Sequence, residues 1–205
     1  MKKVILTVMA VFAFGFVNAQ KAEFGIKAGL NIANQNYSGE EAPSPSSIIG
    51  FQVGGFVDIK IADKFSIQPE LLYSTQGSKF NMLIDYEGTE YDTENTFKLA
   101  YINIPVMFKY YATEKFNLEV GPQIGFLTSS KIKVNVIGQS VTQDLNDVFE
   151  SVDFGLNLGA GFNFTKNISA GVRYNFGLSN AANADDESND KIKNSVFSIS
   201  MGYKF

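Results

Sequence analysis

Four charged residues lie inside segments whose apolar and polar side chains alternate, at comparable distances from short turns: Glu70, Lys109, Glu119 and Arg173. Two carboxylates that face two cations inside a protein would form a gate or a narrow ion path, or would neutralise one another in a filled interior. A pair of carboxylates also performs glycoside hydrolysis, but nothing else in the sequence supports such a site. The pattern favours a cluster of mutually neutralised charges.

The residue types that are missing argue against most catalytic chemistry. Among 205 residues the chain has 19 Phe and 9 Tyr but no Trp, His or Cys. Without Cys there is no disulfide, thiolate metal site, cysteine nucleophile or acylated lipoprotein cysteine. Without His the commonest general base and the usual zinc ligand are missing. A formal charge of −4 argues against a nucleic-acid partner. We therefore expect no enzyme and no catalytic, cofactor-binding or metal site.

Other motifs fit loops or strands better than ligand sites. The acidic run at 185–190 lacks the spacing and glycine of a calcium loop, so a solvated loop is favoured. Acidic and aromatic residues alternate at 85–94, in a predicted loop that would contact a partner protein or surface glycan, or would simply be exposed. Residues 42–47 read as a flexible or extended loop. The glycines of 155–161 lie in a strand pattern with no helix following, which excludes a phosphate-binding loop.

Alternation with a period of two runs through most of the chain. The alternating segments span residues 24–32, 49–61, 65–74, 101–110, 116–126, 153–164, 168–178 and 197–205. This period places successive side chains on opposite faces of a sheet. Eight such segments of about ten residues are typical of a small membrane barrel.

The connections between these segments differ in length in a regular way. Those after the second, fourth and sixth segments are tight turns, whereas 33–47, 76–96, 129–150 and 179–194 are long. Transmembrane barrels have this asymmetry, with short periplasmic turns and long external loops. An even strand number also returns both ends of the barrel to the periplasmic side.

The two faces of the segments differ in chemistry. One is Ile, Val, Leu, Phe and Ala, and the other is Gly, Asn, Ser, Gln and charge. In lipid the apolar face points outward and the sheet must close to pair its backbone groups. The sequence thus predicts an all-β fold, an eight-stranded antiparallel up-and-down transmembrane β-barrel. A soluble exported barrel that carries a lipid is the alternative. The predicted inward charges are Lys27, Asp58, Lys60, Glu70, Lys109, Glu119, Asp153, Arg173 and Lys204.

Three prolines interrupt the regular pattern: Pro69, Pro105 and Pro122. Proline donates no ladder hydrogen bond and avoids central strands. We expect bulges or locally missing bonds at these positions.

The first 19 residues are typical of a secretory signal. Lys2 and Lys3 precede an apolar stretch at 4–17, which is short for a spanning helix. Cleavage is expected between Ala19 and Gln20, which leaves 20–205 as the barrel domain; a membrane anchor is the alternative. Loss of two lysines leaves 15 basic against 21 acidic residues, a charge of −6.

The last segment is apolar and aromatic on one face, through Phe197, Ile199, Met201, Tyr203 and Phe205. It resembles the terminal strand of outer-membrane barrels, whose assembly machinery reads a final aromatic residue. The alternative is the last strand of a soluble sandwich.

Several segments together resemble one family. They are FGIKAGLN at 24–31, IQPELLYS at 67–74, YINIPVMFKY at 101–110, Gly121-Pro122 and GVRY at 171–174. The chain resembles the small outer-membrane β-barrels common in Bacteroidetes, described as porin-family or PorT-like. The resemblance implies a Gram-negative outer-membrane location but no single activity, and only some members are tied to protein secretion.

The expected function is therefore that of a non-enzymatic integral outer-membrane barrel with a structural, surface-interaction or secretion-associated role. A narrow porin-like channel is the alternative, although eight strands leave little room for a pore. The expected partners are outer-membrane lipid, the barrel assembly machinery during biogenesis, and surface or secretion partners at the loops. No cofactor is expected.

Overall fold

The computed structural model describes residues 22–38, 45–86, 89–136, 139–145, 148–181 and 191–205, without the side chains of 82–92 and 136–139. The predicted signal peptide 1–19, its cleavage site and the acidic run 185–190 lie outside the described residues. The strands are β1 (Ala22–Ser38), β2 (Ser46–Ala62), β3 (Phe65–Tyr86), β4 (Thr89–Tyr111), β5 (Phe116–Val136), β6 (Gln139–Asp144), β7 (Val152–Asn163), β8 (Ile168–Gly177) and β9 (Lys191–Lys204). Within the described residues, no helix is long and apolar enough to cross a membrane.

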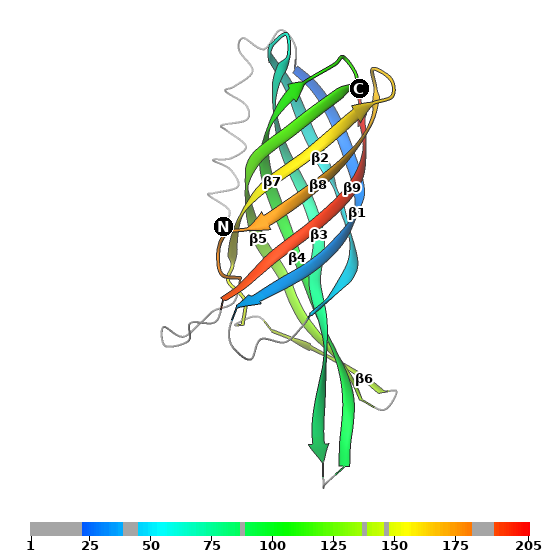
Figure 1. Cartoon of the computed structure of the whole chain (residues 1–205), viewed down its shortest axis with the longest axis vertical. Helices are drawn as coiled ribbons and strands as arrows, with labels where there is room; N and C mark the ends of the chain where they lie inside the picture. The colour runs from blue at the N-terminus through cyan, green and yellow to red at the C-terminus, as the bar shows by residue number, and fades with distance from the viewer. Residues whose placement is uncertain (1–21, 39–44, 87–88, 137–138, 146–147, 182–190) are drawn as a thin grey trace.

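Eight of these strands form a closed ring. The sheet order is β4-β3-β2-β1-β9-β8-β7-β5-β6, and a further pairing between β4 and β5 closes it. Neighbouring strands pair antiparallel throughout, and β6 pairs with β5 outside the ring (Figure 1). The predicted fold is confirmed, with β6 as an additional ninth strand.

Because side chains alternate along each strand, every second one points outward towards lipid and the others point into the lumen. Outward apolar residues are exposed, as with Leu30 at 60% and Leu158 at 56%, whereas inward polar residues such as Gln68 and Asn157 are each 1% exposed. Closure of the sheet pairs the backbone groups that lipid could not solvate. The polar interior and apolar exterior are the reverse of a soluble protein.

All four predicted long loops contain strand residues: 33–38 belong to β1, 46–47, which were also part of the predicted loop 42–47, belong to β2, and 191–194 belong to β9. The other two predicted loops are extensions of strands over most of their length. The predicted loop 76–96 is the far part of β3 and β4, paired out to Tyr86↔Thr89, and 129–150 contains the end of β5 and all of β6. The loop prediction was wrong there because polar residues also form ladders in water when their pairing stays in register. We call the projecting parts, residues 77–86, 89–100, 129–136 and 139–144, the external sheet (Figure 1).

Glycine is required where the external sheet begins. Gly77 has a φ of 143°, and a Cβ on it would lie 2.0 Å from the carbonyl oxygen of Phe97. A side chain would therefore force β3 and β4 apart at this point.

The prolines interrupt pairing without shifting it. Between β3 and β4 the pairs Pro69↔Val106 and Leu72↔Asn103 share one register, with no pair assigned in the described stretch between them. The β4–β5 ladder has the same gap between Pro105↔Gln123 and Phe108↔Val120. Missing bonds are thus the right prediction and bulges the wrong one. The register shifts lie elsewhere, at Ser47/Gln52, Lys60/Ala62 and Ala100/Tyr101.

Candidate functional site

A buried ion-pair cluster crosses the lumen. Arg173 on β8 donates from Nη1 to Glu70 Oε2 at 3.0 Å and from Nη2 to Glu70 Oε1 at 2.9 Å. Its Nε donates to Glu119 Oε1 at 2.9 Å. The side chains of Glu70, Glu119 and Arg173 are only 0, 6 and 8% exposed. Such bidentate, charge-assisted bonds fix geometry as well as adding energy.

Two lysines and a glutamine complete the cluster. Lys27 on β1 lies 2.8 Å from Glu70 Oε1, and Gln68 donates to the same oxygen at 2.6 Å. Lys109 donates to Gln68 Oε1 at 2.6 Å and lies 3.9 Å from Glu119 Oε2. We call these residues the lumen cluster: Lys27, Gln68, Glu70, Lys109, Glu119 and Arg173.

The structure brings together all four charges that the sequence singled out. They come from β3, β4, β5 and β8: β3, β4 and β5 are successive neighbours in the ring, with Lys109 directly opposite Glu119, and β7 separates β5 from β8. The contact with Gln68 was missed, because a neutral side chain carries no signal of its own beyond its inward register. Lys60, predicted to point inward, lies opposite the buried Ser66 and lines the open cavity at the short-turn end, where its side chain is solvent-exposed.

A cavity opens at the end of the barrel where the short turns lie. Its volume is about 1160 Å³, and its walls include Lys60, Lys64, Lys115 and Lys166. At its floor Tyr111 donates to Asp58 Oδ2 at 3.0 Å, and Lys204 lies 3.6 Å from the same oxygen. A separate space of about 20 Å³ lies against Lys109, Asn117 and Glu119, enough for one water molecule. The cavity therefore stops at the lumen cluster.

Hydrogen-bonded polar side chains fill the lumen on the other side of the cluster. Asn175 donates to Asn157 at 3.1 Å, and Ser78 donates to Gln35 at 2.7 Å. Further along, Asn194 lies 3.4 Å from both Asp153 Oδ2 and the Tyr101 hydroxyl. Among the described residues, no group of three or more His, Cys, Asp or Glu is placed to hold a metal ion.

An apolar plug closes the end with the long connections. Leu99, Tyr101, Phe149 and Ala181 are buried together, and Phe97, Leu127 and Leu145 pack against them. The Phe149 ring meets Phe97 edge-on at 5.5 Å between centroids. Backbone bonds from Leu127 N to Ser151 O and from Glu150 N to Ala181 O, both 2.9 Å, hold the connection in place. Sequence reasoning missed Phe149 because its segment, 139–151, has no alternation of apolar and polar residues.

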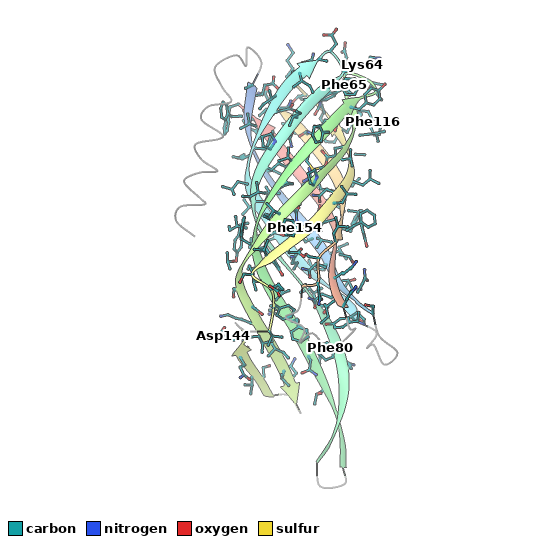
Figure 2. All side chains as sticks on the ribbon, turned by 90° about the vertical axis from the view of Figure 1, so that its left-hand side faces the viewer. Lys64, Phe65, Phe80, Phe116, Asp144 and Phe154 are labelled. Atoms are coloured by element: carbon teal, nitrogen blue, oxygen red, sulfur yellow. The ribbon has the colours of Figure 1, made fainter. Side chains whose placement is uncertain are left out.

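The outward residues form an apolar belt around the ring. Phe65 and Phe116 lie near the short turns, and Phe154 lies further along (Figure 2). Phe197, Ile199, Met201 and Tyr203 of β9, and Phe205 after it, are all exposed, from 36 to 75%. Phe205 N donates to Phe24 O at 2.9 Å, which extends the ladder towards β1.

Known proteins share this architecture. A family profile described as "Outer membrane protein beta-barrel domain" matches residues 18–183. The chain is similar to the crystal structure of Neisserial surface protein A (TM-score 0.55, 16% identity), covering 91% of this chain and 100% of that chain. It is also similar to Ail of Yersinia pestis (TM-score 0.47, 15% identity, 91% and 100% covered). OprG of Pseudomonas aeruginosa has a TM-score of 0.42 and 12% identity, with 90% and 96% covered. No curated protein matches the chain. The likeness to the neisserial protein shows a common barrel fold.

Proposed function

The chain belongs to the outer membrane protein beta-barrel domain family, and from this premise we propose that it is a non-enzymatic outer-membrane protein that acts through its external surface. One observation carries the proposal. The lumen is blocked twice among the described residues, by the lumen cluster and by the apolar plug around Phe149. A barrel with a filled interior presents its chemistry on the parts that leave the membrane. Among the described residues the largest such part is the external sheet.

Its role is then structural, surface-binding or secretion-associated. The external sheet would meet the partner, because the edge of an exposed sheet pairs with an added strand of another protein. The family-like segments at 24–31, 67–74 and 101–110 support a closer kinship with PorT-like barrels of Bacteroidetes. Export by a signal peptide cleaved between Ala19 and Gln20, and recognition of β9 by the barrel assembly machinery, complete the proposal.

A narrow channel is the second candidate. The cavity of about 1160 Å³ at the short-turn end favours it, because this cavity already opens the lumen at that end of the barrel. Conduction would still require the Arg173–Glu70 ion pair to separate and the Phe149 side chain to leave the apolar plug at the other end of the barrel. The soluble lipid carrier has no such support, because the described interior is polar and the apolar side chains point outward.

Cell fractionation followed by electrophoresis with and without boiling tests the proposal. A closed barrel in the outer-membrane fraction will run at a different mobility after heating. The purified protein will then show no conductance in planar bilayers. A soluble periplasmic protein would overturn the membrane assignment, whereas steady conductance by the wild type would favour the channel.

A further inference from the structure

We infer that the outward face of the external sheet binds phosphate groups on the outer-leaflet glycolipid of the same membrane. The inference rests on the proposed function in one respect, that the long connections point away from the cell. Four lysines carry it: Lys79, Lys98, Lys131 and Lys133. We call them the lysine patch.

Pairing register places the lysine patch on one face. Lys98 on β4 lies directly opposite Lys131 on β5, and Thr96 lies opposite both Lys79 on β3 and Lys133 on β5. Directly opposed residues share a face with Cβ atoms about 5 Å apart, so the four lysines surround Thr96 on three adjacent strands. Lys98 is exposed, and the side chains of Lys79 and Lys131 are 37 and 49% exposed.

Folding alone does not account for this arrangement. Like charges directly opposite each other in a ladder are destabilising, and the Lys98↔Lys131 pair is of this kind. Lys79 pairs with Glu94, and Lys131 lies 3.6 Å from Asp144. In the described part of the chain, Lys98 and Lys133 have no carboxylate within ion-pair distance. A ligand with several negative charges would relieve the repulsion.

A register shift in β5 builds the patch. The β4–β5 ladder slips by one residue between Ala100↔Ser129 and Tyr101↔Leu127. One slip exchanges the faces of a strand. Apolar side chains such as Phe126 therefore face lipid before the slip, whereas Lys131 and Lys133 face outward after it. On the same strand Ile132 lies opposite Phe97 and so faces inward with it.

The lysine patch lies on the same outward face as the lipid-facing belt, further along the strands towards the external sheet. On β4 Lys98 lies four residues beyond Ile102 on the same face, about 13 Å along the strand at about 3.3 Å per residue. At this position the apolar stems of the lysines lie next to the edge of the belt, and their ammonium groups face the polar head groups. Among the described side chains, Glu94 and Asp144 are the carboxylates paired with the patch, which gives four cations against two anions there. The excess positive charge of the lysine patch and its position just beyond the apolar belt together fit phosphate groups that lie next to the acyl chains.

The test measures binding of lipopolysaccharide to the full-length protein in phosphatidylcholine nanodiscs. The variant K98Q/K133Q removes the two lysines that have no ion pair with a described carboxylate and keeps the Lys79–Glu94 and Lys131–Asp144 pairs. Each basic residue near an anionic lipid surface contributes about fivefold to binding, so we expect about 25-fold weaker binding. The charge-preserving variant K98R/K133R should bind like the wild type. The matched control K64Q/K166Q removes the same charge at the short-turn end and should also bind normally.

Each outcome is decisive. Equal binding by K98Q/K133Q and wild type, or equal binding of dephosphorylated lipopolysaccharide, overturns the inference. So does displacement by millimolar inorganic phosphate or by a soluble sulfated polysaccharide, because the site would then serve a free anion or a glycan. Heat-modifiable mobility will show that each variant is folded, and removal of the Lys98–Lys131 repulsion should leave its urea midpoint unchanged or higher. If the wild type is absent from the outer membrane, the proposed function itself fails.

Discussion

The lumen cluster predicts a large loss of stability when one carboxylate is neutralised. Glu70 accepts hydrogen bonds from Lys27, Gln68 and two nitrogens of Arg173, and its side chain is fully buried. Glu70→Gln keeps the shape but leaves three cations, Lys27, Lys109 and Arg173, facing Glu119 alone within the cluster. Removing one partner of a buried ion pair costs about 3–5 kcal/mol. The unfolding equilibrium constant should therefore rise by a factor of about 10² to 10⁴.

Urea unfolding in phosphatidylcholine vesicles will measure this loss. The chain has no Trp, so the folded fraction is better read from the mobility of unboiled protein on a gel than from Trp fluorescence. At a slope of about 2 kcal/mol per molar urea, we expect the midpoint to fall by about 1.5–2.5 M.

A matched control separates burial from charge. Glu94→Gln breaks the pair with Lys79, but those side chains are 40 and 37% exposed, and exposed pairs are worth at most about 1 kcal/mol. The double variant Glu70→Gln/Arg173→Met should lose less stability than the sum of the two single variants. Each single variant leaves one charge of the Glu70–Arg173 pair buried without its partner, whereas the double variant removes both charges. Equal midpoints for Glu70→Gln and Glu94→Gln would refute the reasoning.

Three further predictions test the lipid face, the plug and assembly. Leu158→Arg puts a charge in the middle of the belt and should cost about 2–4 kcal/mol in the same urea assay, whereas Val141→Arg on β6, where the native side chain is 67% exposed, should be neutral. Phe149→Ala opens the apolar plug but should not create conductance in planar bilayers, because the lumen cluster remains; current through this variant would show that the cluster does not close the lumen. Phe205→Ser should lower the outer-membrane level more than Phe65→Ser at the same end of the barrel. Equal levels on immunoblots of membrane fractions would contradict the proposed role of the last strand.

The ring was predictable because its pattern is local. The alternation at 116–126 or 168–178 can be seen from neighbouring residues alone, and it shows directly which face of the strand is apolar and which is polar. The limits of β3 and β4 were not predictable in the same way. Residues 76–96 are polar enough to form a loop, and only the partner strand decides that they form a ladder instead.

The candidate site shows the same division. The sequence by itself determined that Glu70, Lys109, Glu119 and Arg173 point to the polar side of the sheet, because side-chain direction depends on a period of two. It also determined that the opposite face is apolar, which identifies lipid as the outer solvent.

Only the tertiary structure decided which charges meet. Glu70 and Arg173 are 103 residues apart, and their contact depends on the closure of the ring and the tilt of its strands. The placing of Phe149 in the mouth and of Lys98 opposite Lys131 likewise depends on register and on one slipped residue in β5. The period of two determines which face a side chain lies on, but the pairing of distant strands determines which residue it contacts. No local sequence pattern encodes that pairing.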